Sequence, residues 1–323
     1  MGCYALHRRL RFHLIRIPLA ALALGAACAL APALALGQTL VGGDLQKRVN
    51  GVLALMGFML TPDVTTGSLA ISNAATGNPD FGMTTAGGGF TMSRDFPLYL
   101  EGTLGYSRYD PTFVASNGQA QGSLAAKWDA YSATGGIGWD FPVAEGLALR
   151  PIFNVSYGRV DSNVSATGQT GAGAEFDFLA SGRLDAYGLG GSLVLDYQRY
   201  RPENEIDVEL RYTNIYLRSF GGSSEAVQGS ADSQSVSLWA RWRAPTGMTL
   251  LERPLRYVLE FAHTTFLGDL DGVLGFNYLS SVGTGLELDS SARDLGVTRT
   301  RLMARYKVGE HARGWSVGLA ASF

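Results

Sequence analysis

The sequence predicts an all-β fold: a closed antiparallel transmembrane β-barrel of about twelve strands, preceded by an N-terminal signal peptide. Apolar and polar residues alternate one by one through many segments, which places them on opposite faces of a strand. Glycine is frequent, with 42 residues, and the 14 tyrosines and 15 phenylalanines favour strands. Charged residues make up only 17% of the chain, which is low for a surface that meets water alone.

Residues 1–37 have the composition of a secretory signal peptide. Four arginines and no acidic residue precede a long apolar run. Pro32 breaks that run just before a small-residue site, so we expect cleavage near Ala35. The alternatives are an uncleaved membrane anchor and a lipid attached at Cys28. Both cysteines, Cys3 and Cys28, lie in this segment, so the mature chain would contain no disulfide.

Residues 38–50, QTLVGGDLQKRVN, form a short periplasmic or luminal segment between the signal peptide and the barrel. We expect a short helix or a plug in the lumen, because the segment is too short for a secreted passenger domain. Removal of the signal peptide takes away four arginines and changes the formal net charge from −2 to −6. No basic patch or acidic tail remains, which argues against nucleic acid as a partner.

Residues 51–323 form the predicted barrel. Alternation recurs in about twelve segments, several of them long enough for a tilted crossing of ~9–11 residues. In EIDVELRYT, for example, Ile206 and Val208 share one face and Asp207 and Glu209 share the other. The predicted strands are residues 51–62, 81–94, 97–109, 127–141, 147–160, 184–198, 205–218, 234–244, 254–267, 274–289, 295–308 and 313–323.

The two faces of these strands differ in a way that suits a membrane. In a soluble sandwich the apolar face forms the core and the polar face meets water. In a membrane barrel the apolar face meets lipid between two aromatic girdles, and the polar face lines a lumen. Here the polar face is strongly charged and the apolar face ends in Tyr, Trp and Phe. Together with the strand lengths, this pattern favours the membrane barrel.

The connections alternate between long and short for most of the chain. Long polar stretches cover residues 61–80, 110–126, 161–182 and 221–234, and short turns lie between them. Long loops on one side and short turns on the other are typical of bacterial outer-membrane barrels. An even strand number leaves both ends on the periplasmic side, and the last strand must pair with the first because lipid tolerates no open edge.

Several stretches taken in order, among them LYLEGTLGYSRYDPTFVASNG, EIDVELRYTNIYL, LWARWRAPTG and the terminal GLAASF, resemble the solitary outer-membrane autotransporter-like β-barrel family. The resemblance extends from about residue 50 to the end of the chain. It implies a translocator-type barrel without a passenger, in the outer membrane of a Gram-negative bacterium. The expected partners are outer-membrane lipid, lipopolysaccharide and the barrel assembly machinery. By the same resemblance, the alternating last strand is the C-terminal assembly signal, carried by Trp315, Val317, Leu319 and Phe323.

Charged residues on the polar face are the most informative candidates for a site. A charge that faces lipid costs roughly 2–4 kcal/mol at the middle of the bilayer, so we expect these residues to line the lumen. They could form ion pairs that fill a narrow barrel, or they could line a pore with a mild preference for anions. The predicted lumen residues are Arg150, Asp207, Glu209, Arg211, Arg241, Arg243, Arg256, Glu260, Glu287, Arg299, Arg301 and Arg305, with Glu101 on the same face of its strand.

Residues suited to catalysis or to metal binding are scarce. His263 and His311 are the histidines of the mature chain, and no serine and orienting group accompany either of them in the sequence. We interpret His263 as a residue of the barrel rim and His311 as part of an exposed turn. GDLDG, residues 268–272, suits a hairpin turn better than a calcium loop. We therefore predict no enzyme activity, no cofactor and no metal.

The glycine strings at residues 87–89, in TGGIG and in GLGGS lie within predicted strands. They suit tight packing or bends in a closed barrel, not phosphate binding. The predicted function is that of a narrow pore or of a plugged structural barrel with a charged lumen. The alternatives are an outer-membrane lipase or protease, and a surface adhesin that acts through the long loops.

Overall fold

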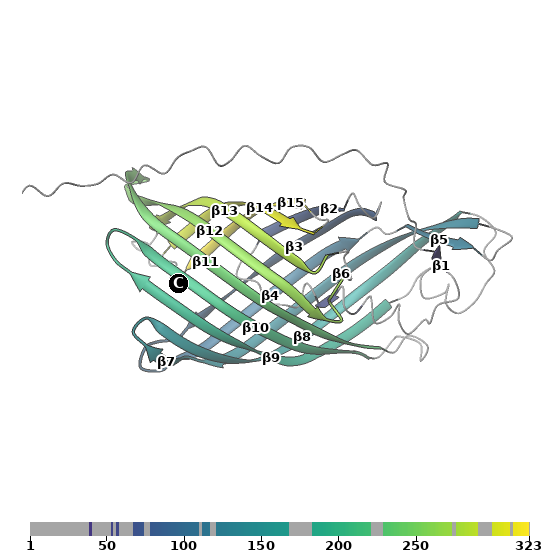
Figure 1. Ribbon diagram of the computed structural model, residues 1–323, viewed down its shortest axis with the longest axis horizontal. Coiled ribbons are helices and arrows are strands. Elements are labelled where there is room, and N and C mark those ends of the chain that lie inside the picture. Colours follow the sequence, from purple (N-terminus) through teal and green to yellow (C-terminus); the bar gives the residue numbers. More distant parts are fainter. Residues whose placement is uncertain are drawn as a thin grey trace, which may run out of the picture. The chain divides into compact units, whose positions relative to one another are not determined.

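A computed structural model describes the protein, and all of its described residues belong to one compact unit, residues 35–323 (Figure 1). The predicted signal peptide, residues 1–37, lies outside them. No helix among the described residues is long and apolar enough to cross a membrane. The described residues are 39–40, 53, 56–57, 67–73, 78–109, 112–116, 121–167, 183–220, 229–272, 276–289, 299–310 and 313–322.

Long antiparallel strands dominate the fold, and they cross the long axis of the view at a slant (Figure 1). Two of them reach 21 residues each. The strands are β1 (Thr39–Leu40), β2 (Gly67–Asn73), β3 (Asn78–Thr91), β4 (Leu98–Tyr109), β5 (Thr112–Ser116), β6 (Gln121–Trp139), β7 (Phe141–Ala144), β8 (Leu147–Thr167), β9 (Arg183–Tyr200), β10 (Glu205–Phe220), β11 (Ser230–Leu250), β12 (Arg253–Gly268), β13 (Tyr278–Asp289), β14 (Arg299–Gly309) and β15 (Arg313–Ser322).

The strand pairs form a closed ring. From β6 the ring runs through β4, β3 and β2 to β15, and then through β14 to β8 in descending order. β15 pairs with β2 from Arg313↔Ser72 to Val317↔Ser68, and β8 pairs with β6 over nearly its whole length. Three short strands, β1, β5 and β7, lie beside this ring. The predicted closed antiparallel barrel is therefore confirmed.

The first predicted strand, residues 51–62, is wrong. Leu53, Met56 and Gly57 are helical and completely or almost completely buried, and the first strand of the ring begins at Gly67. The barrel therefore does not start at residue 51, and the first predicted loop contains its first strand. In the segment 38–50, the described residues Thr39 and Leu40 form β1, which pairs in parallel with β5, where we expected a helix or a plug.

Later strands match the prediction within a few residues, and their ends differ most on the long-loop side. The predicted loop 110–126 contains β5 and the first residues of β6, which pair with each other. β8 continues to Thr167, and β11 spans Ser230–Leu250 around the predicted residues 234–244. The extensions on the long-loop side, residues 121–126, 161–167 and 230–233, are mostly polar, so hydrophobic alternation ended there before the hydrogen-bonded ladder did. At the short-turn end, β11 continues through Pro245 and Met248 to Leu250. The turn predicted at residues 268–272 is present, with Gly268 and Gly272 at positive φ.

Outward faces of the strands carry exposed apolar side chains. Examples at mid-height are Leu104, Val155, Leu210, Leu259 and Leu302, all more than 40% exposed. Aromatic residues lie at both ends of this face. The ring pairs Phe96–Trp139 at the short-turn end and Tyr106–Tyr131 at the long-loop end have centroid separations of 5.3 and 5.2 Å.

We had expected the inward faces to be polar along the whole barrel, but only part of the interior is. Charged residues fill the short-turn half, and hydroxyl and amide groups follow them at mid-height. In the long-loop half, the inward side chains Leu184, Ile215, Leu217 and Phe266 are apolar and buried. The helical residues Leu53 and Met56 are buried as well, and an added Cβ at the inward-facing Gly158 would overlap the Met56 sulfur. The sequence 51–62 is apolar because part of it packs inside the barrel.

Glycines within the strands allow close approach of neighbouring backbones, which confirms their predicted structural role. At Gly190 in β9, an added Cβ would overlap the Asn214 carbonyl oxygen and lie 2.6 Å from the Ile215 Cα on β10. Gly87 and Gly285 show the same kind of crowding against the backbone of the next strand. A closed barrel needs such bends.

Replacing Gly190 by alanine should destabilise the barrel by about 1–3 kcal/mol, because the backbone of β10 would have to move. The measurement is the temperature at which the unboiled protein loses its faster electrophoretic migration. Gly135→Ala is the matched control, since no heavy atom lies within 4 Å of the added Cβ at that site. Equal stability of the two variants would contradict this reading of the packing.

Candidate functional site

An ion-pair belt lies on the buried faces of the strands at the end where short turns join them. It runs from Asp140, next to the turn after β6, to Arg301 near the start of β14. Every second side chain of a strand points inward, so the inward positions beside the short turns bring side chains of neighbouring strands together at that end. The members of the belt are Asp140, Arg150, Asp196, Glu205, Asp207, Arg241, Arg243, Arg256, Glu287, Arg299 and Arg301.

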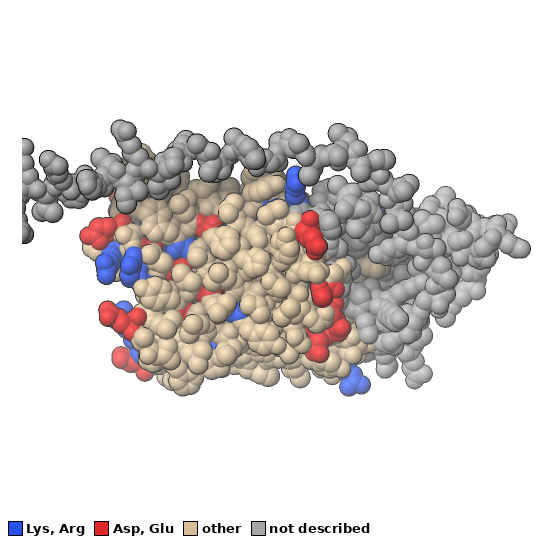
Figure 2. Space-filling model, in the orientation of Figure 1, with Lys and Arg blue, Asp and Glu red and all other residues tan. Residues whose placement is uncertain are grey.

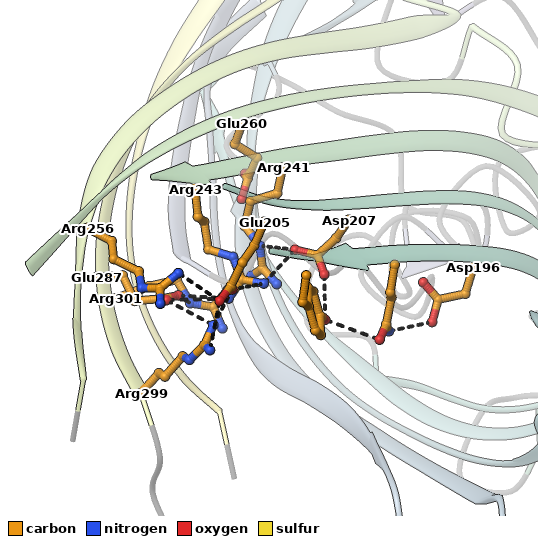
Figure 3. Close-up of polar contacts among 12 residues, drawn as sticks. Asp196, Glu205, Asp207, Arg241, Arg243, Arg256, Glu260, Glu287, Arg299 and Arg301 are labelled. Carbon is orange, nitrogen blue, oxygen red and sulfur yellow. Dashed lines mark hydrogen bonds and ion pairs between the residues drawn. The ribbon is translucent and has the colours of Figure 1, made fainter. Parts of the chain in front are cut away.

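Glu205, the first residue of β10, is the centre of the belt (Figure 3). Its Oε1 accepts a hydrogen bond from Arg256 Nη1 at 2.7 Å, and its Oε2 lies 3.0 Å from Arg243 Nη2. Arg299 on β14 also donates to both of its oxygens. The carboxylate is buried, whereas the side chains of Arg256 and Arg299 keep about a quarter of their surface exposed. One carboxylate on β10 thus joins three other strands, β11, β12 and β14.

Two further carboxylates extend the belt on either side of Glu205. Asp207 accepts hydrogen bonds from Arg241 and Arg243 at 3.0 Å and from the Tyr200 hydroxyl at 2.7 Å. Glu287 on β13 lies 2.8 Å from Arg301 Nε and 3.3 Å from Arg243 Nη1. Its side chain is 1% exposed, so its charge must be met by these neighbours.

Arg150, on β8, closes the other end of the belt. It pairs with Asp140 and, at 2.9 Å, with Asp196 on β9. Its guanidinium lies over the ring of Tyr99, 3.9 Å from the centroid. Gln198 donates a hydrogen bond to Asp196, and its Oε1 lies 3.1 Å from the hydroxyl of Tyr200, the residue that donates to Asp207.

A separate ion pair spans the lumen at mid-height. Arg211 of β10 donates to both oxygens of Glu101 on β4, at 2.9 and 2.7 Å. β6, β8 and β9 lie between these two strands in the ring, so this contact crosses the interior and does not follow the wall. Asn154 of β8 donates to the same carboxylate at 2.7 Å, and Glu209 lies 4.0 Å from Arg211. Both side chains of the pair are about 5% exposed or less.

All twelve charged residues predicted for the polar face lie on the inward side of their strands. Ten of them join the belt or the pair at mid-height, and Arg305 pairs with Glu260 one level above the belt. Asp140, Asp196 and Glu205 were missed. Glu205 shares the two-residue register of Asp207 and Glu209, so alternation alone could have found it. Asp196 stands opposite Glu209 across the β9–β10 ladder, and the sequence does not contain that register.

His263 lies on the outward face, beside Leu238 across the β11–β12 ladder, as expected for a rim residue. Its surroundings correct the sequence analysis, which found no serine near it. Ser280 on β13 is directly opposite, and its Oγ is 2.8 Å from His263 Nδ1. Thr265 Oγ1 lies 3.2 Å from the other ring nitrogen. Cross-strand pairing brings these groups together, and His311 lies outside the described residues.

Trp315, Val317 and Leu319 project outward from β15 and are each more than 60% exposed. Phe323, the fourth residue of the predicted assembly signal, lies outside the described residues. β15 is hydrogen-bonded on both sides, to β14 and to β2. Its exposed side chains therefore belong to the outer wall and not to an open sheet edge.

No family model matches the sequence, and the curated proteins contain no match. Among solved structures, the chain is similar to autotransporter β-domains. For the β-domain of the Bordetella autotransporter BrkA, identity is 16%, the TM-score is 0.44, and the match covers 80% of this chain and 96% of that one. For the transport unit of the autotransporter AIDA-I from Escherichia coli, identity is 13%, the TM-score is 0.47, and the match covers 85% of this chain and 99% of that one. For the translocator domain of the autotransporter NalP from Neisseria meningitidis, identity is 14%, the TM-score is 0.41, and the match covers 87% of this chain and 95% of that one.

Replacing Glu205 by glutamine should destabilise the barrel by roughly 3 kcal/mol, because the buried belt would lose the charge that faces three arginines. The measurement is urea unfolding in lipid vesicles, followed by tryptophan fluorescence. Glu203→Gln, in the exposed turn between β9 and β10, removes the same charge and should leave stability unchanged. An equally stable Glu205→Gln protein would show that the belt does not stabilise the barrel.

Proposed function

We propose that this chain is a plugged outer-membrane barrel of autotransporter-like architecture, which serves as a structural wall and not as an open channel. The outward face supports the membrane part of this proposal. Apolar side chains cover its middle, and aromatic rings lie at both ends. Figure 2 shows that most of the visible face is uncharged and that charged side chains gather toward its two ends. On this reading, the short turns are periplasmic and the long loops are extracellular.

The helical residues inside the barrel carry the proposal that the lumen is closed. Leu53 and Met56 are fully buried, and the Ser233 hydroxyl on β11 donates to the Gly57 carbonyl at 3.3 Å. Leu270 and Phe276, from the connection between β12 and β13, are also buried. An added Cβ at Gly57 would lie 2.9 Å from Leu270 Cδ2, so the connection and the helix pack together.

Charged residues in the short-turn half of the barrel also support a closed lumen. The Glu101–Arg211 pair crosses the lumen, and the belt fills the short-turn end with paired side chains. Among the described inward residues, the eight carboxylates Glu101, Asp140, Asp196, Glu205, Asp207, Glu209, Glu260 and Glu287 nearly balance eight arginines and Lys307. A strong preference for anions is therefore not expected if residual conductance exists. Assembly into the membrane would use the outward face of β15.

Met56→Asp should raise the ion conductance of the reconstituted barrel several-fold, because a buried carboxylate would drive the helical segment out of its apolar surroundings. Single-channel recording in planar bilayers measures this change, and the unmodified barrel should conduct very little. The matched control is Leu251→Asp, in the exposed turn between β11 and β12.

Two outcomes would contradict the plugged barrel. One is a large, steady conductance in the unmodified protein. The other, an unchanged conductance in a Met56→Asp protein that still shows heat-modifiable migration and is therefore folded, would show that the helical residues do not close the lumen.

A second candidate function is ester hydrolysis, favoured by the contact between Ser280 and His263. A hydrolase also needs donors for the oxyanion of the tetrahedral intermediate. Ser280 lies in the middle of the sheet, paired with His263 on one side and with Val308 on the other. The backbone N–H groups of such a strand donate to its neighbours and are not available to a substrate. We therefore favour the structural barrel. The long loops, which an adhesin would use, lie largely outside the described residues.

Ser280 should not react with an alkyl fluorophosphonate in lipid vesicles, because nothing stabilises the oxyanion beside it. Mass spectrometry of the peptide that contains Ser280 measures this, with Ser280→Ala as the blank. Labelling that disappears in His263→Gln would favour hydrolysis over the structural role.

A further inference from the structure

We propose that the outward face of β4, β6, β8, β9 and β10, at the long-loop ends of these strands, binds the phosphate monoesters of the outer-leaflet glycolipid. The inference rests on the proposed function, which places this end of the barrel at the cell surface. Five cationic side chains form the site, here called the outer cationic row: Arg108, Lys127, Arg159, Arg183 and Arg218.

Strand register makes the members of this row neighbours on the barrel wall. Arg108 on β4 is opposite Asp129 on β6, and Asp129 is opposite Asp161 on β8. Asp161 is in turn opposite Arg183 on β9. Lys127 and Arg159 lie two residues from Asp129 and Asp161 on the same strands, and Arg218 on β10 is opposite Tyr187, four residues from Arg183.

Two carboxylates bind members of the row, and a third, Asp129, lies among them without balancing the whole charge. Asp185 accepts hydrogen bonds at 2.7 Å from Arg159 Nε and from the Tyr157 hydroxyl. Asp161 accepts one from Arg183 Nε at 3.3 Å. Asp129 accepts one from the Tyr106 hydroxyl at 2.7 Å. Five cations thus face three carboxylates, which leaves a net charge of +2 on the outward face.

The height of the row matches the depth of a lipid phosphate. Tyr106 lies two residues closer to the middle of the barrel than Arg108, and Tyr131 is paired with both Tyr106 and Arg159. Aromatic rings of a barrel lie at the level of the headgroup boundary. Arg159 and Arg218 lie opposite these rings, at Tyr131 and Tyr187, and Arg108, Lys127 and Arg183 lie further toward the long loops. The row therefore extends from the aromatic level to the level where the phosphates of the headgroups lie. The row has an excess of positive charge, which a dianionic phosphate complements. A zwitterionic headgroup carries its own cation and complements the row less well.

Cationic side chains are concentrated on one side of the barrel. On β11 to β14, the described outward residues at the same end include Asp232, Thr265, Tyr278 and Val308, and none is a lysine or an arginine. Arg313, at the start of β15, is a further exposed outward arginine at this end, and it is opposite Val308. The five cations on β4 to β10 thus form the larger group, which points to a lipid contact on that side.

Native mass spectrometry of the full-length barrel in dodecyl maltoside tests the inference. The barrel is titrated with bisphosphorylated hexa-acyl lipid A and with the same lipid after phosphatase treatment. The double variant Lys127→Gln/Arg218→Gln should bind the phosphorylated lipid about tenfold more weakly than the unmodified barrel, and the dephosphorylated lipid equally well. Excess inorganic phosphate should not displace the lipid, because the acyl chains also pack on the apolar band.

The matched control is Arg94→Gln/Arg201→Gln, which removes the same charge from exposed positions at the short-turn end and should bind as the unmodified barrel does. Equal affinity of the unmodified barrel for the two lipids, or an equal loss of affinity in the control, would overturn the site. Displacement by inorganic phosphate alone would show that the row binds free anions and would overturn the lipid assignment. A barrel that does not insert into lipid vesicles would instead contradict the proposed function, so the two failures are distinguishable.

Discussion

Closure of the backbone ladder is the constraint on which the rest of this structure depends. A sheet with an open edge leaves unpaired N–H and C=O groups, and hydrocarbon offers them no partner. Here β15 pairs with β2 and β6 pairs with β8, so every strand of the ring has a described partner on both sides. Once the ring is closed, side chains can take only two environments, and alternation along each strand distributes them between the two.

Closure also forces the interior to satisfy its own charges. A buried carboxylate or guanidinium costs several kcal/mol unless a partner and hydrogen bonds compensate it. The barrel meets this need with shared contacts: Glu205 is bound by arginines from β11, β12 and β14, and Arg243 touches Glu205, Asp207 and Glu287. Such a network links β10, β11, β12, β13 and β14 at the short-turn end. The inward charges predicted from the sequence are thus paired with one another in the structure.

The long-loop half of the interior solves the problem differently. It contains few charges and buries apolar side chains of β9, β10 and β12 against Leu53 and Met56. Sequence periodicity predicted a strand at residues 51–62, because a short apolar run suits a strand and a buried helical segment equally well. Only the tertiary structure, in which apolar inward side chains surround Leu53 and Met56, distinguishes the helical segment from a strand. The long-loop ends of β6, β8 and β11 were missed for a related reason, since alternation of hydrophobicity stops where these strands extend beyond the apolar band.

The sequence by itself determined the strand period, the approximate strand positions and the side of the wall on which each charged residue lies. Those properties follow from local backbone geometry, which sends neighbouring side chains to opposite faces. The tertiary structure alone decided which charges meet, such as Glu101 with Arg211 across the lumen, and which hydroxyl stands beside His263. Register between strands and curvature of the ring set those contacts, and both arise from pairings between residues far apart in the chain.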